Sequence, residues 1–328
     1  MQNDVDVFII QKQTTLERYT KSKINIDFFD YLERDKQTPV PLQEAHNEHT
    51  KSRDILIKAL EKYSITYKIF NLDELASNNI CYYNDKCKNS GLNPKMKIVI
   101  SLGGDGTLLH ASHHVGGEVA LLGINSCPAH SVGHMCPIVP NDIEKAICCI
   151  VNKEYSTKSV RRIKLEVSRK QIVPLALNDV LLCNRHPAAT SRYQLGIFSA
   201  DFASEFASEK QLSSGLWVST AAGSTAAISS YGFQKLDLLS PQILAAAREP
   251  YTPRNESLQL KQFSIDGNEK SLLFFSRMRQ GLVCVDGPDS CAYLGFGDTV
   301  KMSLPKECAL NLVLDFFGKV PLFPIDNG

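Results

Sequence analysis

The chain has 328 residues, of which 43% are hydrophobic and 22% charged, and its formal net charge is +1. This composition is typical of a globular protein long enough for two domains. The near-zero charge argues against a nucleic acid or an anionic membrane as the main partner, and no apolar run approaches the ~20 residues of a membrane span. The chain ends show no signal-peptide or targeting pattern, and the ten cysteines are scattered as free thiols would be. We therefore expect a cytoplasmic protein.

The first half of the chain alternates predicted strands and helices. Apolar and β-branched runs predict strands at residues 5–10, 67–70, 98–101 and 119–124, and apolar residues at helical spacing predict helices at 48–63 and 141–152. This order indicates a parallel sheet covered by helices, with a ligand bound beyond the carboxyl ends of the strands. The polar segment at residues 77–94 is typical of a surface loop.

The pattern changes near residues 154–158. Short strand-like runs separated by turn residues follow, at 163–167, 180–183, 194–198, 216–219, 272–275 and 282–285. Such spacing predicts an antiparallel β domain. The apolar run at residues 309–314 predicts either a further strand or a packed tail.

Residues 103–107, Gly-Gly-Asp-Gly-Thr, form the most informative motif. They follow a predicted strand and precede helix formers, which predicts a strand, a tight loop and a helix. Glycines allow the backbone to approach a ligand, and a helix N-terminus favours phosphate. A carboxylate repels phosphate, so Asp105 is predicted to bind Mg²⁺ or to accept a proton. A purely structural turn would explain the glycines but not Asp105, and the motif is neither a Walker loop nor a Rossmann fingerprint.

Two further motifs carry polar groups. Asn178 and Asp179, in Ala-Leu-Asn-Asp-Val, could read an adenine edge or a ribose hydroxyl, although Asn-Asp is also a common turn pair. Residues 219–227, Ser-Thr-Ala-Ala-Gly-Ser-Thr-Ala-Ala, could form a close-approach surface with several donors. The same segment could instead be an ordinary helix start capped by Ser224 or Thr225.

Together, the three motifs resemble the NAD kinase family. That family pairs a Gly-Gly-Asp-Gly loop with an Asn-Glu/Asp pair and a segment like Ser-Thr-Pro-Thr-Gly-Ser-Thr-Ala-Tyr. The resemblance covers residues 95–302 and includes Val285-Asp286-Gly287. Alanines at 221, 222 and 227 replace the family's Pro-Thr and closing aromatic, which looks like the plant-type NADH kinase branch.

The resemblance implies an α/β N-terminal domain at residues 1–155, a parallel sheet with helices that carries the Gly-Gly-Asp-Gly loop. It implies a mostly antiparallel, β-sandwich-like, dinucleotide-binding domain at 156–302. Residues 303–328 are then expected to form a C-terminal tail that packs back on the N-terminal domain.

The implied activity is that of an NAD(H) kinase, which moves the γ-phosphoryl of ATP to the adenosine-ribose 2′-hydroxyl of NAD or NADH and makes NADP or NADPH. Mg²⁺ is the implied cofactor, and a homodimer is the implied assembly. Asp105 is the candidate catalytic base. The implied ligand-binding residues are Gly103, Gly104, Gly106 and Thr107 for phosphates, and Asn178, Asp179, Thr220, Gly223, Ser224, Thr225 and Ala226 for the dinucleotide.

Two other functions stay open. A lipid kinase of the diacylglycerol or sphingosine type shares the Gly-Gly-Asp-Gly-Thr loop, but its acceptor site must suit an acyl chain, and residues 219–227 are small and polar. A non-catalytic dinucleotide-binding protein would keep the pocket, but the intact Asp105 argues against it.

A zinc site is the remaining alternative for one segment. Cys127, His130, His134 and Cys136 could supply four zinc ligands, but their spacing is too tight for the usual pair of zinc knuckles. An ordinary loop is the favoured interpretation, and no metal-ligating residues are assigned.

Overall fold

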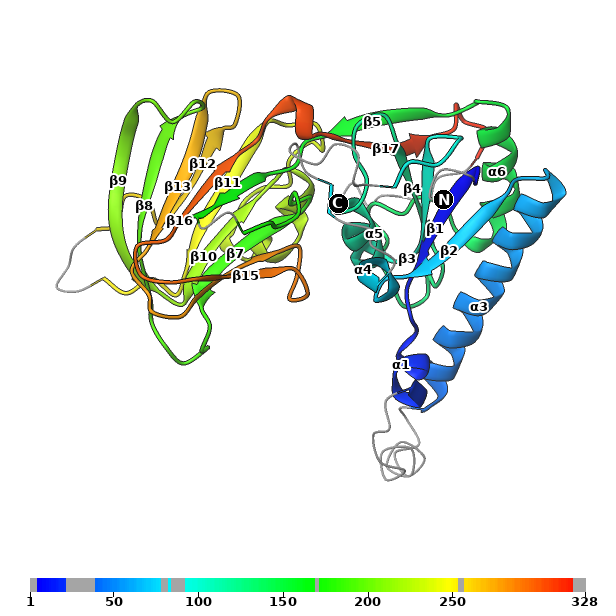
Figure 1. Cartoon of the computed structure of the whole chain (residues 1–328), viewed down its shortest axis with the longest axis horizontal. Coiled ribbons are helices and arrows are strands. Elements are labelled where there is room, and N and C mark those ends of the chain that lie inside the picture. The colour runs from blue at the N-terminus through cyan, green and yellow to red at the C-terminus, as the bar shows by residue number, and fades with distance from the viewer. Residues whose placement is uncertain are drawn as a thin grey trace. The chain divides into compact units, whose positions relative to one another are not determined.

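The computed structural model describes residues 5–21, 39–77, 82–83, 92–168, 171–252 and 257–320, so most of the loop predicted at 77–94 lies outside the described residues. The chain forms two compact units (Figure 1). The first draws on residues 1–81, 91–158 and 311–328, and the second on 82–90 and 159–310. The chain therefore leaves the first unit within a strand near residue 158 and returns to it near residue 311, whereas the sequence suggested boundaries at 155 and 302.

A six-stranded sheet forms the centre of the first unit, in the order β2-β1-β3-β4-β17-β5. Its strands are β1 Val7–Gln11, β2 Tyr67–Asn71, β3 Ile98–Gly103, β4 Ala120–Asn125, β5 Ser156–Val160 and β17 Leu310–Asp315. The pairs β1–β2, β1–β3, β3–β4 and β4–β17 are parallel, which confirms the predicted parallel sheet. The apolar run near the end of the chain is therefore a strand within this sheet.

Helices flank this sheet. Those of the first unit are α1 Thr15–Lys21, α3 Pro39–Lys62, α4 Glu74–Ser77, α5 Asp105–Ser112 and α6 Ile143–Val151. Leu56 of α3 and Ile147 of α6 belong to one buried cluster with Ile9 and Ile100 of the sheet. In α6 the buried residues recur at helical spacing, as expected for a helix with one face on the core.

Two antiparallel sheets form the second unit. One has the order β12-β11-β10-β7-β14-β15 and the other β6-β16-β13-β8-β9. Their strands are β6 Lys164–Val167, β7 Asp179–Asn184, β8 Ser191–Ser199, β9 Glu205–Ser213, β10 Gly215–Ser219, β11 Gln242–Arg248, β12 Gln262–Asp266, β13 Lys270–Ser276, β14 Gly281–Val285, β15 Cys291–Leu294 and β16 Thr299–Ser303.

A single core joins these two sheets. Val180 and Val218 of the first sheet share a buried cluster with Tyr193 and Phe274 of the second. Alternate residues of each strand therefore face one core, as in a β-sandwich. The predicted antiparallel, sandwich-like fold is confirmed.

One expectation from the cysteines is wrong. Cys284 of β14 and Cys291 of β15 lie opposite each other in register and are joined by a disulfide. This pair could not be predicted from the sequence pattern, because strand register decides which two cysteines meet. The other described cysteines are free. No helix in the described ranges is long and apolar enough to cross a membrane.

Candidate active site

The motif at residues 103–107 forms the predicted strand, turn and helix. Gly103 ends β3, Gly104 is the N-cap with an extended backbone (φ −107°, ψ −167°), and Asp105 begins α5. The Gly104 carbonyl accepts the N–H groups of Thr107 at 3.0 Å and Leu108 at 3.2 Å. Helix geometry leaves the first N–H groups without an i−4 carbonyl, so this start can offer donors to an anion.

Close packing explains two of the three glycines. A Cβ on Gly103 would collide with the Thr107 side chain, and a Cβ on Gly104 would collide with the Ser131 hydroxyl. A Cβ on Gly106, by contrast, would meet nothing nearby, and Gly106 is exposed. Gly103 and Gly104 therefore build the turn, while Gly106 keeps the surface of the first helical turn bare.

The Asp105 carboxylate is held by the loop that follows β4. Its Oδ2 accepts the backbone N–H of His134 at 2.8 Å, and its Oδ1 accepts that of Met135 at 2.9 Å. A carboxylate oxygen can accept more than one hydrogen bond, so these two contacts do not use up its acceptor capacity. The side chain is thus fixed in orientation and still able to accept a proton or bind a cation.

Cys136 adds a third contact to this carboxylate. Its side chain is fully buried. Burial, followed by the charge of Asp105 and a hydrogen bond to it, raises the pKa of the Cys136 thiol well above its usual value. The thiol therefore stays protonated and acts as a donor to Asp105. Sequence reasoning missed this contact, since nothing in the pattern pairs the two positions.

The four residues weighed as zinc ligands are used differently in the structure. The Cys127 thiol donates to Glu48 Oε2 at 2.8 Å, whereas the Cys136 thiol contacts Asp105. His130 is exposed, and His134 contributes its backbone N–H to Asp105. Among the residues that the structure describes, no three potential metal ligands lie together.

In the second unit, the other two motifs lie in contact. The Asn178 carbonyl accepts the Thr220 N–H at 2.9 Å and the Ser219 hydroxyl at 3.1 Å. The Thr220 hydroxyl donates to the Leu177 carbonyl at 2.5 Å. A Cβ on Gly223 would collide with the Asn178 carbonyl. Two segments about forty residues apart in sequence therefore form one surface.

The predicted binding residues of 219–227 divide into two groups. Thr220 and Ser224 are buried, and their hydroxyls are used within the segment or against its neighbours, with Ser224 Oγ accepting the Leu236 N–H at 3.1 Å. Thr225 and Ala227 are exposed, and Ala226 is half-buried. The buried group stabilises the conformation of the segment, and the second group forms the part of its surface that a ligand can reach.

Asn178 and Asp179 carry unusual polar environments. The Asn178 Oδ1 atom is buried and has no hydrogen-bond partner in the described part of the chain, which is costly unless a ligand supplies one. Burial, and then the neighbouring charge of Asp286, raise the pKa of Asp179 to about 7. A buried unpaired oxygen and a carboxyl with a raised pKa are both typical of a site that binds a polar ligand.

Asp286 organises this pair. One of its carboxylate oxygens accepts the N–H of Leu177 at 2.8 Å, and the other accepts those of Asn178 at 2.7 Å and Asp179 at 3.0 Å. Its own N–H donates to the Asp179 carbonyl at 2.9 Å. The resemblance included Val285-Asp286-Gly287 and allowed Asp286 to face the site, although an Asp before Gly is more often a turn residue; the bonds to residues 177–179 were not predicted.

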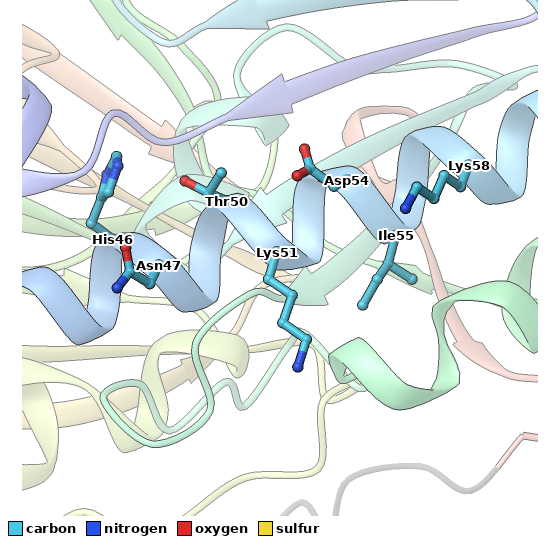
Figure 2. Close-up of a pocket in the computed structure, with 7 residues that line it drawn as sticks. All are labelled: His46, Asn47, Thr50, Lys51, Asp54, Ile55 and Lys58. Atoms are coloured by element: carbon cyan, nitrogen blue, oxygen red, sulfur yellow. The ribbon is translucent and has the colours of Figure 1, made fainter.

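A cavity of about 440 Å³ lies elsewhere, along α3 of the first unit (Figure 2). Its lining residues all come from that one helix: His46, Asn47, Thr50, Lys51, Asp54, Ile55 and Lys58. None of them belongs to the three motifs, so this surface hollow is not part of the candidate site.

Comparisons with known proteins point to the same family as the three motifs. Residues 32–155 match the family model described as the ATP-NAD kinase N-terminal domain. The chain is 35% identical over 222 residues to the NADH kinase of Arabidopsis thaliana, covering 63% of this chain and 69% of that relative. It is 30% identical over 221 residues to the probable NADH kinase of Oryza sativa subsp. japonica, covering 63% and 67%.

Two solved structures share the fold at low sequence identity. An NAD kinase from Archaeoglobus fulgidus in complex with ATP matches with a TM-score of 0.59 at 16% identity, covering 96% of this chain and 95% of that one. Yeast NADH kinase complexed with NADH matches with a TM-score of 0.61 at 17% identity, covering 97% and 86%. The sequence identity to the plant relatives, together with the shared fold, shows that the chain belongs to the NAD kinase family.

Proposed function

We propose that this protein is an NAD(H) kinase, an ATP-dependent phosphotransferase that moves the γ-phosphoryl of ATP to the adenosine-ribose 2′-hydroxyl of NAD or NADH. The observation that carries the proposal is the Asp105 carboxylate at the start of α5, held by two backbone N–H groups. Family membership supports the reaction. The ATP and NADH complexes of the structural relatives support the identity of the donor and one acceptor.

Phosphoryl transfer needs alignment, charge neutralisation and an acceptor for the hydroxyl proton. In this proposal, the ribose 2′-oxygen attacks the γ-phosphorus, Asp105 takes the proton of the 2′-hydroxyl, and ADP leaves. The backbone N–H groups around Gly103, Gly104 and Gly106 would hold phosphate oxygens at the start of α5, whereas the Thr107 N–H already bonds to the Gly104 carbonyl. Three protein donors contact the Asp105 carboxylate, and the lone pair that they leave would suit the proton or a hard cation such as Mg²⁺. When bound, Mg²⁺ would neutralise charge on the triphosphate.

In this proposal, the second unit binds the adenosine end of the acceptor dinucleotide. The buried Asn178 Oδ1 atom would accept a donor such as the adenine amino group. Asp179 would bind a ribose hydroxyl, and the exposed Thr225 and half-buried Ala226 would contact the nucleoside. Thr220, Gly223 and Ser224 would position that surface rather than touch the ligand with their side chains.

A direct assay tests the proposal. Purified protein is mixed with Mg-ATP and either NAD or NADH, and NADP or NADPH is measured with a dehydrogenase specific for the phosphorylated dinucleotide. A parallel reaction offers diacylglycerol or sphingosine as acceptor. Product from a lipid alone would overturn the proposal, and dinucleotide binding without product would favour a non-catalytic dinucleotide-binding protein.

The assembly and the compartment belong to the same proposal. The family resemblance favours a homodimer, and light scattering of the purified protein tests this. The cytoplasm is the proposed compartment, and cell fractionation tests it.

A further inference from the structure

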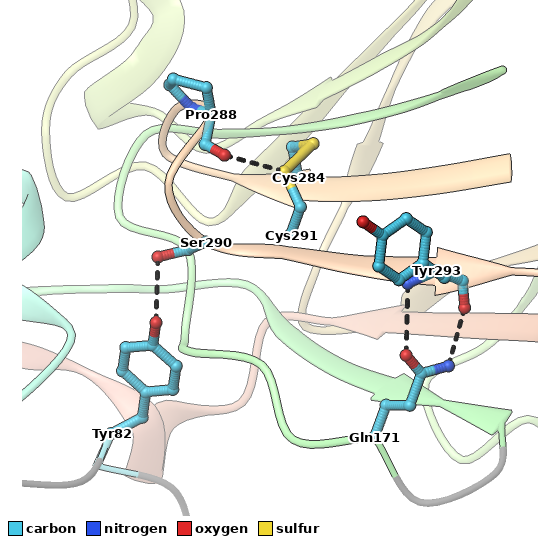
Figure 3. Close-up of a disulfide and its surroundings, with 7 residues drawn as sticks. All are labelled: Tyr82, Gln171, Cys284, Pro288, Ser290, Cys291 and Tyr293. Atoms are coloured by element: carbon cyan, nitrogen blue, oxygen red, sulfur yellow. Dashed lines mark hydrogen bonds between the residues drawn. A yellow bond between two sulfur atoms is a disulfide. The ribbon is translucent and has the colours of Figure 1, made fainter. Parts of the chain in front are cut away.

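A disulfide closes the hairpin formed by β14 and β15 (Figure 3). Cys284 and Cys291 are paired in register, and their disulfide spans seven positions of sequence. The Val285 N–H donates to the Ser290 carbonyl at 2.9 Å, so the ladder continues one step into the enclosed turn. The side chain of Ser290 meets the Tyr82 hydroxyl at 3.4 Å.

Asp286 lies inside this closed turn, two residues after Cys284. Its backbone φ of +50° lies in the left-handed region, which residues with a Cβ adopt rarely. Its carboxylate accepts three successive backbone N–H groups, those of residues 177–179. These contacts join the turn to the segment that carries Asn178, so the conformation of the turn and that of the binding segment are coupled.

We propose that Asp286 is the positioning residue of the dinucleotide site and that the Cys284–Cys291 disulfide fixes it there, so that reduction of the disulfide weakens NAD(H) binding. The inference rests on the proposed function for the identity of the ligand. Asp286 acts through the backbone of residues 177–179 and does not itself touch the dinucleotide.

Two opposing effects determine whether the turn at residues 285–290 keeps its conformation. The left-handed backbone at Asp286 and the proximity of the Asp179 carboxyl both favour release of the turn. The disulfide opposes release by restricting the conformations open to residues 285–290. After reduction of the disulfide, Asp286 is held only by the pairing of β14 with β15 and by its three hydrogen bonds to residues 177–179.

The exposed Cys291 makes the switch chemically accessible. A thiolate of a small dithiol attacks Sγ of Cys291, forms a mixed disulfide and releases Cys284 as a thiolate that takes up a proton. The second thiol of the reductant then attacks the mixed disulfide and frees Cys291. Two electrons pass from the dithiol to the protein, which gains two thiols, and the reductant becomes a disulfide.

Direct NADH binding, measured by NADH fluorescence without ATP, tests the inference. Protein oxidised with glutathione disulfide is compared with protein reduced by dithiothreitol. We expect Kd for NADH to rise roughly three- to tenfold on reduction, as for the loss of about one hydrogen bond, with Kd for ATP unchanged. The double variant Cys284→Ala, Cys291→Ala should show the weak value in both conditions.

Two variants complete the design. Cys183→Ala removes a free, half-buried thiol on neighbouring β7 and should keep the full redox response. Asp286→Asn replaces an oxygen acceptor by an NH₂ donor and should weaken NADH binding in both conditions while abolishing the redox response. If Asp286→Asn fails to fold, the cysteine double variant still decides the question.

Several results would overturn the inference: equal Kd values for oxidised and reduced protein, loss of the response in Cys183→Ala, or alkylation of both Cys284 and Cys291 in the oxidised protein. The proposed function fails separately. Protein that makes no NADP(H) in either redox state yet shows the shift in Kd contradicts only the proposed kinase activity. An active kinase with an unchanged Kd contradicts only the inference.

Discussion

The carboxylate of Asp105 accepts the backbone N–H of Met135 at 2.9 Å, so the candidate base and the loop after β4 are held by one another. Both partners belong to the first unit. The neighbouring N–H of His134 binds the other carboxylate oxygen. A substitution at Asp105 therefore changes two things at once, the proton acceptor and the anchor of a loop.

We expect Asp105→Asn to lower kcat by ~10²–10⁴-fold, the usual loss for a general base. The amide NH₂ would also face a backbone N–H, so the free energy of unfolding should fall by about 1–3 kcal/mol. Kinetics, urea unfolding and NADH binding separate these effects.

The matched control for this change is Asp142→Asn. Asp142 also stands at a helix start, that of α6, where its side chain makes no cap hydrogen bond. This control should leave kcat and stability close to the parent values. An Asp105→Asn protein that retained more than about a tenth of the parent kcat, outside the range for a lost base, would exclude Asp105 from that role.

We expect Asn178→Ala to weaken dinucleotide binding by about 1–3 kcal/mol, because a buried ligand group would lose its partner. Affinity for ATP should stay nearly unchanged. Calorimetric titration with each ligand measures both. Asn184→Ala, at the far end of the same strand β7, is the control and should alter neither affinity. Equal losses for ATP and dinucleotide would mean that Asn178 is structural.

The raised pKa of Asp179 predicts a pH-dependent stability. The carboxyl titrates near pH 7 in the folded protein, against an ordinary value of 3.8, so the folded state binds this proton more tightly. The corresponding stabilisation is present below the ordinary value and is lost as pH rises toward 7. In Asp179→Asn this contribution disappears, so the variant should gain stability relative to the parent as pH rises. Urea unfolding between pH 4 and 8 measures the difference, and parallel curves for the two proteins would refute it.

The fold could be predicted where burial leaves a clear pattern. Strands β3 and β4 are buried along their whole length, and their apolar runs predicted a parallel sheet. The strand β9 was missed, because most of its residues are exposed or half-buried and its sequence alternates weakly. The place of β17 was left open, because pairing between β4 and a segment at the other end of the chain depends on tertiary structure.

The candidate site could be predicted to the extent that it consists of local motifs. The loop at residues 103–107 was singled out from residue type and position, whereas the segments around Asn178 and Gly223 received a binding role only through the resemblance to NAD kinases. The groups that hold them were missed, namely the Cys136 thiol on Asp105 and the Asp286 carboxylate on residues 177–179. These contacts join segments far apart in sequence, and nothing in the residue types specifies the pairing.

We expect the purified protein to contain no stoichiometric zinc. The thiols of Cys127 and Cys136 contact different carboxylates, those of Glu48 and Asp105, and so do not converge on one ion. Elemental analysis after dialysis against a mild chelator measures the metal content. One zinc per chain that is lost on replacing both cysteines by serine would show that the loop binds metal.

The last prediction concerns Ala227, which is exposed at the start of a short 3₁₀ helix, Ala227–Tyr231. In the family's motif, as the resemblance gives it, an aromatic residue stands at this position. An aromatic face attracts the cationic ring of oxidised nicotinamide, and such a contact is worth ~0.5–2 kcal/mol depending on desolvation. Alanine lacks this attraction, and the neutral ring of NADH loses less by its absence. We therefore expect the parent protein to use NADH at least as well as NAD.

Ala227→Tyr should shift kcat/KM toward NAD, by up to the free energy of one cation–π contact. The matched control is Ser229→Tyr, which adds the same ring at another exposed position of the same short helix and should leave the ratio of the two kcat/KM values unchanged. The measurement is kcat/KM for NAD and NADH in all three proteins. A parent protein that strongly prefers NAD over NADH contradicts the prediction. An Ala227→Tyr variant with an unchanged ratio of the two kcat/KM values also contradicts it. In either case, an aromatic side chain at position 227 does not determine which dinucleotide is preferred.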